Sequence, residues 1–288
     1  MTFFSRHHKG ISRRRFLSLG AAGLAGALLA ETVWYEPQAL QVEQSTIPSA
    51  LPGGRIRMVQ VSDLHLSSFD NYFKKVVSQV ASLEPDLIVL TGDYLEEERN
   101  IRGVLSFLKQ LHAQHGIYAV KGNWEYWSRL EGENLRRHFA GAGVKLLINE
   151  RADLEIKGRA LSIYGMDYPS STDYLHRLQQ DIDPRRFNLL LSHVPAFAHE
   201  QLSKHINLVL SGHTHGGQIR LPYLPPFYLP RYSGRFVAGY YQVSEHQVPL
   251  YVSRGVGTSV LPLRFLCRPE IGLFELGRQS IFPDGRTK

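Results

Sequence analysis

Residues of types that bind divalent metal ions recur along this 288-residue sequence, each just after an apolar segment. The seven candidate ligands are Asp63, His65, Asp93, Asn123, His193, His213 and His215. Imidazole nitrogens favour transition metals, whereas carboxylate and amide oxygens favour harder ions. A mixed set without a thiolate therefore predicts manganese, with iron or zinc as the alternatives.

The number of candidate ligands predicts two metal ions rather than one. An extended chain directs alternate side chains to one face, so Asp63 and His65 point the same way, as do His213 and His215. Seven ligands exceed what one such ion uses, whereas two ions that share a carboxylate would use them all. Because such a pair holds the attacking and leaving oxygens of a phosphoryl displacement, we expect in-line attack by a metal-bound hydroxide.

Each motif taken alone also has a purely structural explanation. Asp63 is able to cap a following helix, and Gly92-Asp93 and Gly122-Asn123 are common turn sequences. The two histidines between glycines in residues 212–217 have fewer structural uses and are the most specific single signal. The combination, in this order and at successive segment ends, indicates a metal site.

Alternating strand and helix patterns would place these side chains along one edge of a sheet. Strands are expected at residues 56–61, 87–90, 117–120, 144–148, 153–156, 160–164, 187–191 and 208–210, and helices at 72–83, 101–112, 132–139, 172–180 and 195–203. A β-rich region should follow through Leu276. The order predicts an α/β fold with parallel strands, whose carboxyl ends are where such sheets bind ligands.

The first 35 residues are expected to be an export signal or an N-terminal membrane anchor. Residues 12–17, Ser-Arg-Arg-Arg-Phe-Leu, precede an apolar run to Ala30 and resemble a twin-arginine signal. An ordinary Sec signal is the alternative. The twin-arginine interpretation implies recognition by the twin-arginine export machinery and a location in the periplasm or on the outer face of the cytoplasmic membrane. Residues 36–54, rich in proline and glycine, are expected to be a linker, 55–278 the catalytic domain and 279–288 a tail.

The net charge gives no indication of a nucleic-acid partner. The formal charge is +7, but residues 1–30 contain five basic residues and no acid. Removing those five from the 33 basic residues leaves 28 against 26 acidic residues, or +2. The single cysteine, Cys267, excludes an internal disulfide and a cysteine-rich zinc site, and is expected to be buried.

The ordered motifs resemble those of the calcineurin-like metallophosphoesterase superfamily over most of residues 55–276. They are Asp63-x-His65, Gly92-Asp93, Gly122-Asn123, His193 and Gly212-His213-Thr214-His215. Residues 216–218 and 253–270 resemble the bacterial phosphodiesterase branch, which has twin-arginine-exported members. The resemblance implies a four-layer αββα sandwich with two mixed β-sheets.

The resemblance also implies how the ligands divide. One metal would be bound by Asp63, His65, Asp93 and His215, and the second by Asp93, Asn123, His193 and His213. Catalytic roles are implied for Asp63, His65, Asp93, Asn123 and His193.

One position departs from the family pattern. The family usually has histidine after the Gly-Asn pair, whereas this chain has Trp124, which is unable to deliver a proton at neutral pH. Since general acid catalysis matters most for poor leaving groups, we expect activated esters such as aryl esters or diphosphates to be preferred. His199 and His176 are candidate replacements for the acid.

A proline-rich run, residues 221–230, follows the paired histidines. It is either a rigid loop packed on the core or an exposed apolar lid that touches lipid or an apolar substrate group. The predicted function is a phosphodiesterase or pyrophosphatase, with a lipid-linked phosphate as one candidate substrate. The alternatives are a broad phosphomonoesterase and a catalytically weak metal-binding protein.

Overall fold

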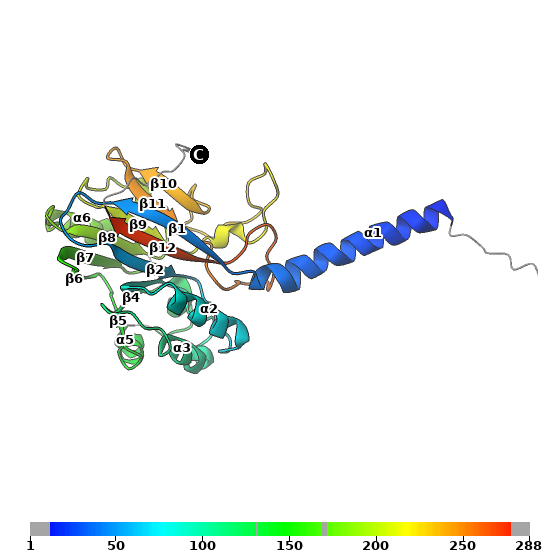
Figure 1. Ribbon diagram of the computed structural model, residues 1–288, viewed down its shortest axis with the longest axis horizontal. Helices are drawn as coiled ribbons and strands as arrows, with labels where there is room; N and C mark the ends of the chain where they lie inside the picture. Colours follow the sequence, from blue (N-terminus) through cyan, green and yellow to red (C-terminus); the bar gives the residue numbers. More distant parts are fainter. Residues whose placement is uncertain (1–11, 131, 169–171, 278–288) are drawn as a thin grey trace, which may run out of the picture.

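Two stacked six-stranded sheets form the centre of the protein, and helices cover their outer faces (Figure 1). The computed structural model describes residues 12–130, 132–168 and 172–277. The first sheet contains, in spatial order, β1 (Gln41–Pro48), β12 (Glu270–Gly277), β2 (Ile56–Val61), β3 (Leu87–Thr91), β4 (Ile117–Val120) and β5 (Val144–Leu146). Its neighbouring strands are parallel except for β12 and β2, so the sheet is mixed.

The second sheet is also mixed. It contains β10 (Gly239–Val243), β11 (Val248–Val252), β9 (Leu208–Ser211), β8 (Phe187–Ser192), β7 (Arg159–Met166) and β6 (Glu150–Ile156). The outer pairs β10–β11 and β6–β7 are antiparallel, and the inner pairs are parallel.

Alternation along the strands builds the core in layers. In β2, Val59 packs with the apolar faces of α2 (Asn71–Ser82), α3 (Ile101–Leu108) and α5 (Gly132–Ala140), whereas its neighbour Met58 packs between the sheets. On the far face of the second sheet, α6 (Thr172–Gln180) covers β7 and β8. The four-layer αββα sandwich implied by the resemblance is therefore confirmed.

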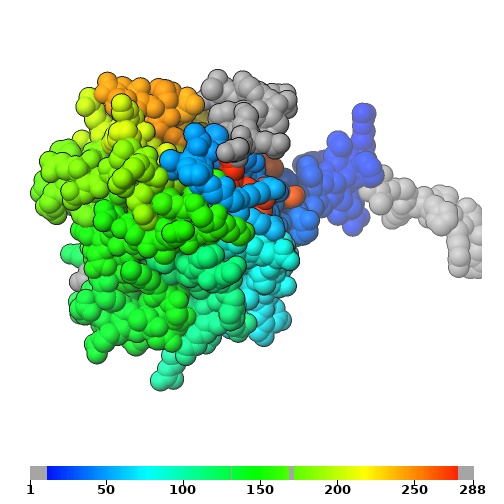
Figure 2. All heavy atoms as spheres, turned by 60° about the vertical axis from the view of Figure 1, so that its left-hand side comes forward, coloured from blue at the N-terminus to red at the C-terminus, as the bar shows by residue number. Residues whose placement is uncertain are grey.

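The N-terminal helix lies outside this sandwich. Helix α1 (Arg13–Ala30) projects away from the domain (Figure 2), and none of its residues is buried. It continues through a π-helical turn (Glu31–Tyr35) and a 3-10 turn (Glu36–Gln38). The expected tail, residues 279–288, lies outside the described residues, as do residues 1–11 of the expected signal.

Several expected elements are wrong in detail. The expected linker at residues 36–54 instead includes β1, whose pairing with β12 buries Ile47. A strand forms there because the prolines and glycines of this segment lie near its two ends. The helix expected at 101–112 ends at Leu108, and that expected at 195–203 is a single 3-10 turn at Ala196–His199. Strand β5 ends at Leu146 rather than at residue 148. Cys267 is buried, as predicted.

Candidate metal centre

The seven candidate ligands lie together where the carboxyl ends of five strands meet. Asp63, Asp93 and Asn123 follow β2, β3 and β4 of the first sheet within three residues. His193 directly follows β8, and His213 and His215 follow β9, both in the second sheet. All seven side chains are buried or nearly so. The site is thus shared by the two sheets and is assembled only when they pack.

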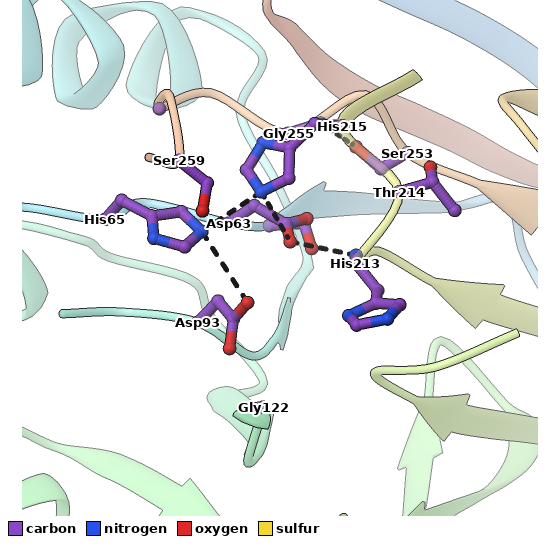
Figure 3. Close-up of polar contacts among 12 residues, drawn as sticks. Asp63, His65, Asp93, Gly122, His213, Thr214, His215, Ser253, Gly255 and Ser259 are labelled. Carbon is purple, nitrogen blue, oxygen red and sulfur yellow. Dashed lines mark hydrogen bonds and ion pairs between the residues drawn. The ribbon is translucent and has the colours of Figure 1, made fainter. Parts of the chain in front are cut away.

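The first group of ligand atoms consists of Asp63, His65, Asp93 and His215, and its atoms all lie within 4.8 Å of one another. Figure 3 shows these side chains directed toward a common centre. His65 Nε2 is 3.0 Å from His215 Nε2 and 3.6 Å from Asp93 Oδ2. Asp63 Oδ1 is 3.6 Å from His215 Nε2.

The second group consists of Asp93, His193 and His213, again with ligand atoms within 4.8 Å. His193 Nε2 lies 3.1 Å from Asp93 Oδ2 and 3.1 Å from His213 Nδ1. The amide oxygen Oδ1 of Asn123 is 3.1 Å from the same His193 nitrogen, which places Asn123 in this group. Asp93 belongs to both groups, and its Oδ2 faces His65 on one side and His193 on the other.

Five of the seven residues have a backbone that non-glycine residues rarely adopt. They are Asp63, His65, Asp93, His213 and His215, with φ between 43° and 74°. Each such residue costs of order 1–3 kcal/mol and persists only where the surroundings enforce it. The clustering of this strain at one place indicates that the backbone is bent to aim side chains at a ligand.

A buried carboxylate supports the ligands from behind. Glu125 Oε2 accepts hydrogen bonds from the backbone N–H groups of Gly122 (2.8 Å) and Asp93 (3.0 Å), and Oε1 accepts that of Tyr94 (2.7 Å). The backbone N–H of Trp124 donates to Asp93 Oδ1 at 2.9 Å. These bonds fix the loops after β3 and β4 together and leave Asp93 Oδ2 directed at the histidines.

Backbone carbonyls orient two of the histidines. Nδ1 of His193 lies 2.7 Å from the carbonyl oxygen of Thr91, and Nε2 of His213 lies 2.7 Å from that of Arg231. A carbonyl only accepts hydrogen bonds, so these ring nitrogens carry the protons. The opposite ring nitrogens, which face the centre, are then free to bind a cation.

Burial and charge give the paired histidines opposite pKa shifts. Burial, with the adjacent His193, lowers the pKa of His213 to about 4. Burial also acts to lower the pKa of His193, but the charge and hydrogen bond of Asp93 raise it to about 9. Burial holds the pKa of His215 well below its usual value. Near neutral pH the metal-free pair of His193 and His213 therefore carries one proton beyond the two on the carbonyl-facing nitrogens, and this extra proton lies on Nε2 of His193.

The donor set fits two cations better than it fits a hydrogen-bonded core. Asp63 Oδ2 is buried without a hydrogen-bond partner among the described residues. Two pairs of imidazole nitrogens converge at about 3 Å, as nitrogens that bind the same cation would. A buried unpaired acceptor such as Asp63 Oδ2 is unfavourable by about 1–3 kcal/mol, and a cation bound to Asp63 would remove that penalty.

Two glycines permit the close approach of these loops. A Cβ at Gly122 would overlap Oδ1 of Asp93, and one at Gly212 would overlap Oδ2 of Asp63. Glycine is therefore required before both Asn123 and His213, which gives the Gly-Asn and Gly-His dipeptides a steric reason.

A cavity of about 390 Å³ opens beside the metal centre. Its walls are mainly apolar and come from three places, namely residues 124–127, 217–230 and 259–261. Trp124 lies edge-on to the ring of His65, with 5.6 Å between the ring centroids. The proline-rich run is exposed rather than packed on the core, since the relative accessible surface areas of Tyr223 and Phe227 are 106% and 72%.

Sequence reasoning missed several residues around the site. Trp127, Val260 and Leu261 line the cavity, and Glu96 Oε1 lies 3.3 Å from Nδ1 of His65. No spacing pattern marked them, because Glu96, Val260 and Leu261 stand in loops of irregular length and Trp127 ends the short helix α4 (Asn123–Trp127). The proposed substitutes for the missing acid are wrong: His199 packs against Phe236, and His176 is exposed on α6, outside the cavity.

Comparisons with known proteins identify similar sequences and structures. The family model described as calcineurin-like phosphoesterase matches residues 56–217. The chain is 34% identical to the uncharacterized metallophosphoesterase YkuE of Bacillus subtilis, over 93% of this chain and 98% of that one. It is 30% identical to a transmembrane protein with metallophosphoesterase domain from Danio rerio, over 81% of this chain and 55% of that one. A solved dimetal phosphatase from Danio rerio aligns with a TM-score of 0.45 at 11% identity, over 70% of this chain and 88% of that one.

Proposed function

Because this chain belongs to the calcineurin-like phosphoesterase family and is a metal-dependent phosphoester hydrolase, we propose that it cleaves phosphodiester or diphosphate bonds. Two divalent cations would be held by the seven residues of the metal centre. Asp63, His65, Asp93 and His215 would bind one, and Asp93, Asn123, His193 and His213 the other. When bound, such ions activate a water molecule and neutralise charge on the phosphoryl oxygens.

The cavity next to the metal centre carries this proposal. No lysine or arginine is found among the described residues that line it. A phosphomonoester carries a second negative charge, which a cationic side chain beside the metals would stabilise by a charge-assisted hydrogen bond. A diester carries one charge and a second organic group, and the apolar walls are suited to that group. The geometry therefore favours a diester or a substituted diphosphate over a monoester.

The leaving group must depart without a histidine in the usual place. Trp124 occupies that position. Among the described residues that line the cavity, Tyr228 is the one titratable side chain outside the metal centre. Tyrosine is a weak acid near neutral pH. Activated leaving groups, such as aryl oxides and phosphates, should accordingly be preferred over simple alkoxides.

The proposal is tested by comparing bis(p-nitrophenyl) phosphate with p-nitrophenyl phosphate, using the full chain with manganese added. We expect kcat/KM for the diester to exceed that for the monoester by at least tenfold. Equal rates, or faster monoester cleavage, would instead indicate a broad phosphomonoesterase. No turnover at all, with two metals bound per chain, would indicate a catalytically weak metal-binding protein.

Manganese is the proposed native metal, with iron and zinc as the alternatives, because the donor set mixes oxygen and imidazole nitrogen. Elemental analysis of protein purified without added metal tests this choice. Two equivalents of manganese per chain would support it, and a site filled with zinc would contradict it.

Export across the cytoplasmic membrane is the proposed fate of the catalytic domain. The arginines of residues 13–15 lie at the free end of α1, and the domain follows its other end. Among the described residues, α1 and its extension are the one helix long and apolar enough to cross a membrane. Replacing Arg14 and Arg15 by lysine should retain the protein in the cytoplasm if the twin-arginine machinery is used, and cell fractionation would detect it.

A further inference from the structure

The helical extension of α1, residues 31–38, is hydrogen-bonded to a loop that forms part of the cavity wall. We call residues 218–238 and 257–269 the rim loops, because both contribute residues to the cavity. The carbonyl oxygen of Thr32 accepts the backbone N–H of Arg264 at 3.0 Å, and Glu36 Oε2 accepts that of Leu266 at 2.8 Å. The rim loops therefore lie at the end of the domain from which α1 emerges (Figure 1).

The helix has the length and composition to cross a bilayer. The helical segment Arg13–Gln38, 26 residues long, contains an 18-residue window with a mean hydropathy of 1.6. At 1.5 Å per residue that window is about 27 Å long, which is close to the ~30 Å hydrocarbon core. Trp34 and Tyr35, 67% and 58% exposed, stand at the end nearest the domain, where an aromatic belt marks a membrane surface. The membrane surface would then lie at the level of the rim loops.

The rim loops expose large apolar side chains that the domain itself does not cover. Those more than half exposed are Tyr223, Leu224, Phe227, Tyr228, Val260, Leu261 and Leu266. Such side chains gathered around one opening mark an interaction surface rather than scattered surface residues. Several of them also line the cavity, so the exposed surface and the cavity wall are continuous.

The charges of the rim loops fit an anionic membrane surface. Neither loop contains an aspartate or a glutamate. Arg220, Arg231, Arg235 and Arg268 are exposed or partly exposed within them, and the Arg268 guanidinium lies over the Tyr35 ring at 6.0 Å. Basic residues next to a membrane-crossing helix are attracted to acidic lipid headgroups.

We propose that the rim loops dock into the lipid bilayer beside α1, so that the cavity opens toward the membrane and takes a phosphoester of a membrane lipid directly from it. The docking is inferred from the position of α1, from the hydrogen bond between Glu36 and Leu266, and from the exposed apolar residues. The choice of substrate rests on the proposed function. Phe227 and Leu261, which are both exposed and part of the cavity wall, give the lipid a route into the cavity.

Docking is tested by fluorescence quenching of the full chain reconstituted in nanodiscs. Single cysteines at Leu224 and at Glu155, an exposed position on the edge strand β6, are labelled with one fluorophore, since native Cys267 is buried. Lipids carrying a quencher in the acyl chain should quench the Leu224→Cys label several-fold more than the Glu155→Cys label. Equal, weak quenching at both positions would overturn the docking, whatever the enzyme's activity. If the surface instead binds a second copy of the chain, the Leu224→Cys label would not be quenched in nanodiscs that hold one copy. That result would also overturn the docking.

Access from the bilayer is tested with two aryl diesters that share a leaving group. One is water-soluble bis(p-nitrophenyl) phosphate, and the other is a dialkylglyceryl p-nitrophenyl phosphate within the nanodisc. The double variant Leu224→Asp, Leu266→Asp lies outside the cavity lining and should keep its rate on the soluble ester within twofold. Its rate on the lipid ester should fall by tenfold or more, whereas Lys145→Asp, on the exposed face of β5, should change neither rate.

The outcomes separate the two proposals. An unchanged rate of the double variant on the lipid ester would overturn access from the membrane. If the unmodified protein cleaves neither ester, the proposed function fails, and the quenching measurement still decides whether the rim loops dock.

Discussion

Oδ2 of Asp93 lies 3.1 Å from Nε2 of His193, and this contact sets the protonation state of the metal-free centre. Without a cation, the proton on His193 balances the buried carboxylate. With a cation, that proton has to leave, because only neutral imidazole binds metal. Metal binding and proton release are therefore coupled at this pair.

The first prediction concerns pH. The pKa of His193, about 9 in the metal-free protein, lies above neutral, so binding at pH 7.5 should release about one proton from this residue. Apparent metal affinity should rise with pH and level off above about pH 9. Calorimetric titration in two buffers of different ionisation enthalpy measures the proton count. A count of zero would contradict the assignment, and His193→Ala should lower the count.

The second prediction concerns the residue shared by both ligand groups. Asp93→Asn should reduce the occupancy of both metals and lower kcat by at least about 10³-fold, because the loss removes the charge that both positions share. Asp183→Asn, at a partly exposed aspartate whose carboxylate pairs with Arg185, is the matched control and should leave both quantities unchanged. Metal content and diester turnover are the two measurements. Full activity of Asp93→Asn would refute the metal-centre assignment.

The third prediction concerns the carboxylate behind the ligands. In Glu125→Gln the amide group would face either the Tyr94 N–H or the Asp93 and Gly122 N–H groups, and donor would then oppose donor. We expect metal affinity to fall about 10- to 100-fold, as for other outer-shell partners. The free energy of unfolding should fall by about 1–3 kcal/mol. Unaltered metal affinity would show that Glu125 does not position Asp93.

The fourth prediction concerns the close approach of the β3 and β4 loops. Gly122→Ala would press a methyl group against the Asp93 carboxylate, so metal binding should be lost while the sheets remain folded. Gly141→Ala is the control, since a Cβ there meets only ordinary contacts at 3.4 Å and 3.5 Å. Circular dichroism and metal titration distinguish a local effect from global unfolding. Normal metal binding by Gly122→Ala would mean that the loops have more room than the structure gives them.

The fifth prediction concerns the position that lacks a histidine. Trp124→His would place an imidazole beside His65 at the cavity wall and supply a proton donor for the leaving oxygen. The rate on alkyl diesters should rise relative to that on aryl diesters, by about 10²-fold if general acid catalysis is restored. Trp127→His, which also lines the cavity, controls for loss of an indole. An unchanged aryl-to-alkyl ratio would mean that Trp124 does not limit protonation.

The sequence by itself determined the types of the ligands, their order and their positions at strand ends. Local rules suffice for this, because a buried strand such as Leu87–Thr91 is recognisable by its apolar run, and the polar residues that follow it must leave the sheet. The resemblance to a family added how the ligands divide between two metals. Gly122 and Gly212 were visible as turn residues, but their steric role was not.

Tertiary structure alone decided what surrounds the centre. Strand β1 was missed because an edge strand with one proline and mixed polarity resembles a linker until β12, more than 200 residues later, pairs with it. The Glu36 carboxylate and the Leu266 backbone meet for the same reason, across 230 positions. Contacts at such separations depend on how the two sheets pack, which no local pattern encodes. The apolar cavity, its rim loops and the exit direction of α1 are therefore properties of the folded chain.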